Sequence, residues 1–390
     1  MEASRGLTRR YFVQRAAALA AVPALPGCLG ATAPGGTTPP PPAAMAAPIP
    51  RWPGYADAVV VDFLASPGYF NYPADPPLDA AMVRNAVESG ITGVNLTVSA
   101  GEFEATVAKI ARWEAEIERY PQALQRVRSV AQLHEAKRTG RLGIMYGFQD
   151  AVPVDRDLDR LQLFGDLGVK VIQLTYNIRN LVGDGCLEPS NAGLSNYGHA
   201  LVRRMGELGI LVDLSHCGQR TTEDAILAAS GPVAISHSGC AAVEPHPRSK
   251  RDEELRSMAE RGGVVGIYLM PFLSPGRVPT TADVMAHLEH ALNVCGEDHV
   301  GIGSDLSVTP IDGSDDYWAK HRDFVARRVA QGIAAPAEDP DFLFTVPELN
   351  SNRRMDLIAD AMAERGHSSA RIEKVLGANW VRLFGEVWKA

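Results

Sequence analysis

The sequence is short of the features that mark several specialised classes of protein. No apolar run reaches the roughly 20 residues that a membrane-spanning helix needs. No run of lysine and arginine is long enough to offset a formal net charge of −8, so nucleic acid and anionic membrane surfaces are not expected as main partners. What is present, 390 residues with 46% hydrophobic and 22% charged side chains, is the composition of an enzyme-sized globular protein.

Cysteine is also scarce, with 5 in the whole chain. One of them, Cys28, lies near the N-terminus. No close spacing pairs the other four into a disulfide framework, and a domain of this size does not need one. We expect each of these four to be a small, buried, apolar residue; they are Cys186, Cys217, Cys240 and Cys295.

The N-terminal segment indicates export. Thr8 to Val13 resembles the twin-arginine signal pattern, and an apolar run of small residues follows from Ala17 to Leu25. Two positions are possible for the end of this signal. One is a lipoprotein box that makes Cys28 the lipidated residue, which we favour, and the other is conventional cleavage after Ala31-Thr32-Ala33.

Three regions follow from this interpretation. Residues 1–28 form the export signal, residues 29–52 are a linker rich in proline and alanine, and residues 53–390 form one folded domain. The linker has almost nothing to bury, which suits a semi-extended tether. We expect the protein in the periplasm or, through a lipid on Cys28, anchored to the outer membrane as an envelope lipoprotein.

The body of the chain repeats one unit, in which a short β-branched run ends at a polar or glycine-containing turn and a helical interval follows. Near-continuous apolar strands separated by helices indicate a parallel sheet that is covered on both sides. Eight units in one domain favour a closed α/β barrel of the (β/α)8 or TIM type. No Gly-x-Gly-x-x-Gly follows the first strand and no Walker A sequence occurs, which disfavours nucleotide binding. The expected strands are Ala58–Asp62, Thr92–Val98, Leu142–Phe148, Lys170–Thr175, Ile210–Ser215, Pro232–Ser236, Gly263–Leu269 and Val300–Ser304.

Helical spacing fills the intervals between these strands. Leu201, Met205 and Leu208 share one helix face. Thr280 is a plausible start for a later helix. Residues 340–390 are expected to add terminal helices, one of them over Ile372–Phe384.

Polar residues at the strand ends predict a metal site. In a barrel of this type the chemistry lies at the carboxyl ends of the strands, where His216, His237 and Asp305 follow the fifth, sixth and eighth strands. Two imidazoles and a carboxylate suit zinc or a similar divalent ion, which lowers the pKa of a bound water and polarises an amide carbonyl. His287 and His290 also have ligand-like spacing, but they have no third partner and are expected at the surface.

Several segments with a common order along the chain identify a family. They are Leu174-Thr175-Tyr176-Asn177, Val212-Asp213-Leu214-Ser215-His216, Ile235-Ser236-His237-Ser238, His246-Pro247-Arg248 and Val300-Gly301-Ile302-Gly303-Ser304-Asp305. Together they resemble the membrane (renal-type) dipeptidases, the M19 metallopeptidases of the amidohydrolase superfamily, over nearly all of residues 57–388. The resemblance implies a metal-dependent hydrolase of a dipeptide or similar small amide with a carboxylate, and it suggests a homodimer.

The family's functional positions are partly retained. The resemblance makes His216 and His237 ligands of one metal ion, and Asp305 an acid or base linked to that metal. It also makes Arg248 the residue that binds a substrate carboxylate. Cys217 follows His216 directly, but its side chain should point elsewhere, so it is not expected to be a ligand.

Other positions of the family are replaced. The family's Asp-Gly-His-Asn-Asp segment after the first strand reads Asp62-Phe63-Leu64-Ala65-Ser66 here, so two ligands of the second metal are absent in kind. The bridging Glu of the family is Gln149, and its active-site His is Tyr176. A neutral amide cannot offset the repulsion between two close cations. A binuclear centre is therefore not expected.

The replacements leave room for one divalent ion, for which we expect zinc with a water in an open position. Asp305 either ligates this ion or takes the proton of the water. Tyr176 is expected to donate a hydrogen bond to a developing oxyanion, and Asn177 beside it is expected to contact the substrate. The expected metal ligands are His216, His237, Asp305 and the carbonyl oxygen of Gln149.

Two other hypotheses stay open. One is a catalytically silent relative that binds a ligand at the barrel mouth, which the replaced residues motivate. The other is a binuclear enzyme whose missing ligands come from Asp62 or Asp150. Arg248 separates the hydrolase from the binding protein only in part, because both could use a bidentate contact with a carboxylate.

Overall fold

Eight parallel strands form a barrel wall in the computed structural model, which describes residues 51–68 and 76–389. Neighbouring strands pair in the order β1, β3, β5, β6, β7, β8, β9 and β10. The N–H of Phe63, next to β1, donates to the carbonyl oxygen of Ile302 in β10 at 3.0 Å, which brings the first strand against the last. The strands are β1 (Val61–Asp62), β3 (Gly93–Thr97), β5 (Leu142–Phe148), β6 (Val169–Gln173), β7 (Leu211–Asp213), β8 (Ala234–Ser238), β9 (Val264–Ile267) and β10 (Val300–Ile302).

The predicted (β/α)8 barrel is therefore confirmed, and all eight predicted strands are present, most of them shorter than expected. Three short strands were missed. β4 (Leu124–Arg126) pairs with β5, and β2 (Ala65–Ser66) pairs with β11 (Leu306–Ser307) in a separate small sheet. Strands of two or three residues carry too little periodicity to be recognised in a sequence. β2 and β11 matter because they join the chain that follows β1 to the chain that follows β10.

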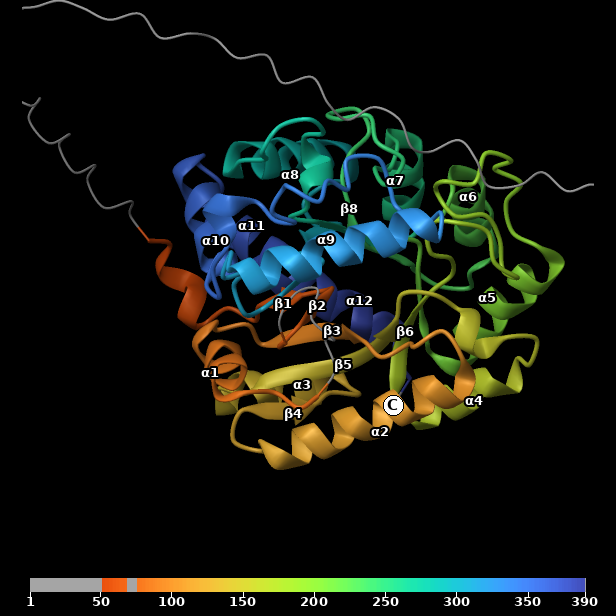
Figure 1. Cartoon of the computed structure of the whole chain (residues 1–390), viewed down its shortest axis with the longest axis horizontal. Coiled ribbons are helices and arrows are strands. Elements are labelled where there is room, and N and C mark those ends of the chain that lie inside the picture. The colour runs from red at the N-terminus through yellow and green to blue at the C-terminus, as the bar shows by residue number, and fades with distance from the viewer. Residues whose placement is uncertain (1–50, 69–75, 390) are drawn as a thin grey trace, which may run out of the picture. The chain divides into compact units, whose positions relative to one another are not determined.

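Helices surround the strands, and α9 runs across the barrel in front of β1 and β2 in Figure 1. A π-helical turn, Lys374–Ala378, links α11 to α12, so the helix predicted over Ile372–Phe384 is present but not uniform. The α-helices are α1 (Ala80–Glu88), α2 (Phe103–Arg119), α3 (Val130–Thr139), α4 (Asp159–Asp166), α5 (Asn196–Leu208), α6 (Gln219–Ala228), α7 (Asp252–Glu260), α8 (Thr281–Cys295), α9 (Asp315–Ala330), α10 (Arg354–Glu364), α11 (Ser369–Glu373) and α12 (Asn379–Val387).

Helix α8 begins where the sequence predicted. Its N-cap is Thr280, whose N–H donates to the carboxylate of Asp283 at 2.8 Å, a local contact that fixes the first turn. The prediction that both histidines of this helix lie at the surface is wrong for His287, which is fully buried. Its Nδ1 accepts from the N–H of Cys240 at 2.9 Å, because α8 packs this face against the chain after β8.

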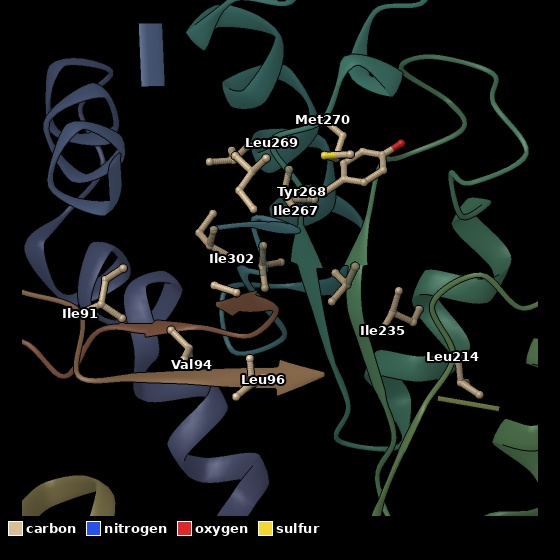
Figure 2. Packing of buried hydrophobic residues seen from close by; sticks show 14 of the residues in the cluster. Ile91, Val94, Leu96, Leu214, Ile235, Ile267, Tyr268, Leu269, Met270 and Ile302 are labelled. Atoms are coloured by element: carbon tan, nitrogen blue, oxygen red, sulfur yellow. The ribbon is translucent and has the colours of Figure 1, made fainter. Parts of the chain in front are cut away.

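Two clusters of buried side chains hold the layers together. The larger cluster joins strand residues to helix residues, and Figure 2 shows part of it around Leu96 and Ile235. In the smaller cluster Phe63 packs on Trp380 and Phe384 of α12, with ring centroids 4.2 and 5.1 Å away. These contacts fix the ends of β1 and β10, next to which the polar residues discussed below lie.

The four cysteines of the described residues have free thiols, two of them buried and two half-buried. The described residues belong to one compact unit, Pro48–Ala390. None of the helices described combines the length and the apolar character that crossing a membrane requires. The predicted signal, most of the tether and Cys28 lie outside the described residues, so these assignments stay predictions.

Candidate metal and substrate site

His216 and His237 meet at the carboxyl ends of two adjacent parallel strands. β7 ends three residues before His216, and His237 lies near the end of β8. Their Nε2 atoms are 2.9 Å apart, and the two residues are only 1% and 0% exposed. The structure thus brings together the two histidines that the sequence singled out.

Hydrogen bonds determine which ring nitrogen of His237 carries the proton. The buried carboxylate of Asp213 accepts from the hydroxyl of Ser236 at 2.5 Å. A serine hydroxyl has one proton to donate, so Ser236 Oγ accepts from the Nδ1–H of His237, 2.7 Å away. The Nε2 of His237 is then left with a lone pair.

The same reasoning applies to His216. The side-chain nitrogen of Asn177 donates to the carbonyl oxygen of Ile333 at 2.7 Å, so the amide oxygen of Asn177 faces His216. This oxygen lies 2.6 Å from Nδ1 of His216 and accepts its proton, because an amide oxygen cannot donate. The Nε2 of His216 also carries a lone pair.

Two imidazole lone pairs therefore face each other across 2.9 Å. Burial, and after it the charge of Arg248, lowers the pKa of His216 and His237 well below the usual value, which disfavours a shared proton. A divalent cation bound by both nitrogens removes the repulsion, and neutral imidazole is a common ligand of zinc. The donor chemistry at this point is that of a metal ligand pair.

Asp305 supplies a carboxylate next to this pair. Its Oδ2 lies 4.0 Å from Nε2 of His237, and its Oδ1 accepts from the side-chain nitrogen of Gln149 at 3.5 Å. Burial raises the pKa of Asp305 to about 6. Asp305 and His216 both have a backbone φ of 60°, a conformation that non-glycine residues adopt at a cost and that concentrates at functional sites.

These donors fit one ion. A tetrahedral zinc ion with bonds of about 2.0–2.1 Å holds its ligand atoms about 3.3 Å apart, so the two Nε2 atoms need to separate by only a few tenths of an ångström. Within residues 51–68 and 76–389, no three His, Cys, Asp or Glu side chains already lie close enough to hold a metal ion. Asp305 would supply a third donor if its Oδ2 moved closer to Nε2 of His237 by less than about 1 Å.

Arg248 is the cation of the site. The residue is only 3% exposed, and among the described residues its Nε and Nη2 atoms have no hydrogen-bond partner. The guanidinium lies 5.6 Å from the ring centre of Phe272 and borders the same cavity as Asp305. Two buried guanidinium nitrogens without a partner are costly, and a bidentate carboxylate would satisfy both of them.

The comparisons with known proteins identify the family. The sequence model of the membrane dipeptidase family, peptidase family M19, matches residues 80–327. The chain belongs to the membrane dipeptidase family. The resemblance inferred from the sequence motifs is therefore confirmed.

Several relatives in this membrane dipeptidase family are similar in sequence. The chain is 31% identical to dipeptidase verJ of Clonostachys rogersoniana, over 60% of this chain and 61% of that protein. It is 29% identical to dipeptidase tcpJ of Claviceps purpurea, over 64% of this chain and 52% of that protein. The matched region thus spans between half and two thirds of the length of these curated relatives.

Solved structures show the same fold. An amidohydrolase from Pseudomonas aeruginosa is 32% identical, with a TM-score of 0.75 over 86% of this chain and 98% of that one. A metallopeptidase from Rhodobacter sphaeroides, solved with a phosphinate mimic of the dipeptide L-Ala-D-Ala, is 19% identical with a TM-score of 0.66 over 85% of this chain and 99% of that one. The second likeness concerns the fold alone.

The carboxylates that could rescue a second metal are engaged elsewhere. Asp62 accepts from the N–H and the hydroxyl of Ser304 at 2.7 and 2.6 Å. Asp150 accepts from the N–H of Val152 at 2.8 Å and from the side chain of Asn180 at 2.9 Å. Neither carboxylate borders the cavity that Asp305 lines, which does not favour the hypothesis that Asp62 or Asp150 replaces ligands of a second metal ion.

Tyr176 occupies the position of the family's active-site His. Its ring stacks on His216 with the centroids 4.1 Å apart. Its hydroxyl accepts from Nη1 of Arg328 at 3.1 Å. Burial raises the pKa of Tyr176, so the phenol keeps its proton and can donate it in a hydrogen bond.

Arg328 and Glu338 are site residues that the sequence reasoning missed. Both come from the segment after β11, and Glu338 accepts two hydrogen bonds from Arg328, at 2.5 and 2.7 Å. Arg328 then reaches Tyr176, and Ile333 in the same segment accepts from Asn177. A helix with many charges such as α9 looks solvent-exposed in the sequence, and only the pair of adjacent arginines near its end hinted at a role.

Two other predicted residues have defined positions. Both ends of the Asn177 amide are engaged, by His216 and Ile333, so its part in substrate binding stays a prediction. The thiol of Cys217 faces Thr175 Oγ1 at 3.4 Å, and burial raises its pKa to about 11. A buried, protonated thiol is a poor metal ligand, in keeping with the expectation that Cys217 does not bind the ion.

A cavity of about 620 Å³ opens over the site. Its volume lies in the range of roughly 300–1,000 Å³ that is typical of ligand pockets. Its lining contains the reactive groups Gln149, Tyr176, Arg248 and Asp305. Further lining residues come from the chain after β1, from β3, from the chain after β9 and from residues 315–344, which contain α9 and are called the α9 segment below.

Proposed function

We propose that this member of the membrane dipeptidase family hydrolyses a small, dipeptide-like amide that carries a carboxylate, with the help of one divalent metal ion, for which zinc is the best candidate. The observation that carries the proposal is the pair of Nε2 lone pairs of His216 and His237, 2.9 Å apart and fixed in that state by Asn177 and Ser236. Such a pair has a clear use in binding a cation and little other use in a buried site.

The metal would be held by His216, His237 and Asp305, with Gln149 at the edge. When bound, an ion of this kind polarises an amide carbonyl and makes water more acidic. The family and its named relatives support metal-dependent hydrolysis of dipeptides in general. The number of ions, and the part that each residue plays, belong to this proposal.

Three side chains bind the substrate, stabilise the developing charge and transfer the proton. Arg248 binds the substrate carboxylate through the two guanidinium nitrogens that have no partner among the described residues. Tyr176 donates its phenolic proton to the oxygen on which negative charge develops. Asp305 accepts a proton from the attacking water through the carboxylate oxygen that does not bind the metal and returns it to the leaving amine nitrogen.

A second candidate is a binding protein without catalytic activity. Leu64 and Ser66, in place of metal ligands of the family, border the cavity, and the unpartnered guanidinium of Arg248 suits carboxylate binding in either case. The two candidates differ at Asp305, which a binding protein does not need as a proton acceptor.

The experiment that separates them measures amide hydrolysis by the purified, zinc-supplied chain. L-Ala-L-Ala, L-Ala-D-Ala and N-acetyl-alanine are offered to the wild type and to Asp305→Asn. We expect metal-dependent release of free alanine from at least one of them, reduced by about 10²-fold or more in the variant. Tight binding of these compounds without any turnover would favour the binding protein.

We further propose that the chain is exported and attached to the membrane through a lipid on Cys28. The twin-arginine pattern and the lipoprotein box support this assignment. The mass of the mature N-terminal peptide tests it, since lipidation and cleavage after Ala33 give different masses. A homodimer, which the family resemblance suggests, is tested by light scattering of the purified chain.

A further inference from the structure

Apolar side chains form part of the cavity lining and are called the apolar wall below. Leu64 follows β1 and Leu96 lies in β3; Phe324 and Phe344 come from the α9 segment, and all four border the cavity with Met270 and Phe272. More of the lining surface is apolar than polar. Figure 2 shows Leu96 and Met270 among the packed side chains of this region. The wall therefore suits a hydrocarbon group of the ligand.

Leu64 links this wall to the changed metal site. It stands where the family's first-strand segment has a histidine ligand, and it is only 5% exposed. By the motif resemblance, this one replacement both removes a ligand and adds apolar surface to the cavity.

The charged groups of the cavity disfavour a free ammonium group on the ligand. The described lining residues include three carboxylates. Glu338 is held by Arg328 at 2.5 Å, and Asp323 is paired with Arg327 at 2.6 Å. The third, Asp305, lies beside the histidine pair, where the proposed chemistry needs it.

The cations of the lining are largely paired as well. Arg327 and Arg328 hold the two carboxylates just named, and Lys320 donates to Asp316 at 2.8 Å. Among the described lining residues, no carboxylate outside the proposed metal site is then left to receive the free α-amino group of a dipeptide. An amide whose nitrogen end carries no charge, but whose other end carries a carboxylate, matches the cavity better.

Resting on the proposed hydrolase function, we propose that the substrate is an N-acyl amino acid with an apolar acyl group. The carboxylate binds Arg248, and the acyl chain lies along the wall formed by Leu64, Leu96, Phe324 and Phe344. Hydrolysis breaks the bond between the acyl carbon and the amide nitrogen. Water supplies the hydroxyl of the released fatty acid and a proton of the released amine, so no further reactant is needed.

The test compares matched substrates on the zinc-supplied chain. N-acetyl-, N-butanoyl- and N-hexanoyl-alanine, in both enantiomers, are compared with the free dipeptide Ala-Ala for kcat/KM, and their binding to the Asp305→Asn variant is measured by calorimetry. Each methylene that is buried adds about fourfold to affinity. We expect kcat/KM for the hexanoyl compound to exceed that for the acetyl compound by on the order of 100-fold and to exceed that for the dipeptide.

Substitutions in α9 test which residue causes the dependence on acyl chain length. Phe324→Ala should reduce the ratio of kcat/KM between the hexanoyl and acetyl compounds by about tenfold or more; Phe324→Leu should be intermediate. Val329→Ala is the matched control, because Val329 lies on the same helix with 62% of its surface exposed and does not border the cavity. It should keep the full chain-length dependence.

The outcomes separate this inference from the proposed function. Hydrolysis of the dipeptide at a higher kcat/KM than any acyl compound would overturn the inference and leave the hydrolase function in place. A chain-length dependence that survives Phe324→Ala would overturn the assignment of the wall. Turnover of neither class would overturn the proposed function, and with it the inference.

Discussion

The ring of Tyr176 is stacked on the imidazole of His216, with the centroids 4.1 Å apart and the planes inclined by 28°. This contact places the phenol ring against a histidine that the proposed function uses as a metal ligand. The position belongs to a histidine in the family, so the replacement keeps a flat, hydrogen-bonding side chain there. It explains how the chain can lose that histidine and still present a donor to a developing oxyanion.

Removing the hydroxyl tests this role of Tyr176. Phe keeps the stacked ring, so Tyr176→Phe should fold normally and bind the metal. We expect kcat to fall by about 10²-fold with KM changed less than threefold, because the hydrogen bond strengthens only in the transition state. Steady-state kinetics on the best substrate measure both constants. A variant that raises KM and keeps kcat would show that Tyr176 serves binding instead.

Arg248 can be tested through the charge of the ligand. Arg248→Ala should weaken binding of a carboxylate compound by about 10²-fold and hardly change binding of the corresponding amide, because a bidentate pair is lost only with the charged ligand. Arg248→Lys should recover part of the affinity, since lysine restores the charge but not the fork. Calorimetric titration with N-acyl-alanine and its amide gives both values. Equal losses for the two compounds would contradict this role.

The Arg328–Glu338 pair allows stability and activity to be separated. The side chain of Glu338 is only 1% exposed, so Arg328→Ala leaves a buried carboxylate unpaired and should cost about 3–5 kcal/mol in the free energy of unfolding. The double variant Arg328→Met/Glu338→Leu should recover most of that loss. Its kcat should stay about tenfold low, because Tyr176 still lacks its partner.

Urea unfolding and kinetics of the same samples check this prediction. A double variant that is stable and fully active would show that the pair only holds the α9 segment in place. A double variant as unstable as Arg328→Ala would show that other contacts of Arg328, such as its bond to the carbonyl of Ile333, account for the loss.

From the buried side chain of His246 we predict that the free energy of unfolding depends on pH. Its Nε2–H donates to the carbonyl of Pro336 at 2.9 Å, and its Nδ1 accepts from the N–H of Arg248 at 3.1 Å. Burial lowers the pKa of His246 to about 4 from an ordinary value of 6.5. Protonation therefore favours the unfolded chain: the contribution of His246 is complete above pH 6.5 and is lost as the pH falls toward 4.

The comparison of wild type with His246→Gln isolates this contribution from other buried histidines. Gln keeps a donor for Pro336 but does not titrate. Between pH 7 and 4 the wild type should lose on the order of 2–3 kcal/mol more unfolding free energy than the variant. Urea melts at five or six pH values measure the difference. Parallel curves for the two proteins would contradict the prediction.

The barrel and the histidine pair could be predicted because they follow from local and repetitive features of the chain. Eight β-branched runs separated by helical spacing define the strands, and the rule that strand ends of a parallel barrel meet places His216, His237 and Asp305 together. The tautomers of the histidines could not be predicted. They depend on Asn177 and Ile333, which are 156 residues apart.

The α9 segment shows more clearly which contacts could not be predicted from the sequence. Arg328 contacts Tyr176 across 152 residues of sequence, and no local pattern announces such a contact. Its helix carries charges on most faces, which indicates solvent exposure. His287 on α8 was misjudged in the same direction, because the chain after β8 packs against a polar residue that the sequence places at the surface. Long-range packing, and not local preference, decides both positions.

Metal stoichiometry tests the central claim most directly. Elemental analysis of the purified chain, after supply of zinc and removal of unbound ions, is compared with the double variant His216→Ala/His237→Ala. The account predicts about one zinc ion per chain in the wild type and none in the variant. Two ions per chain in the wild type, or one ion retained by the variant, would contradict it.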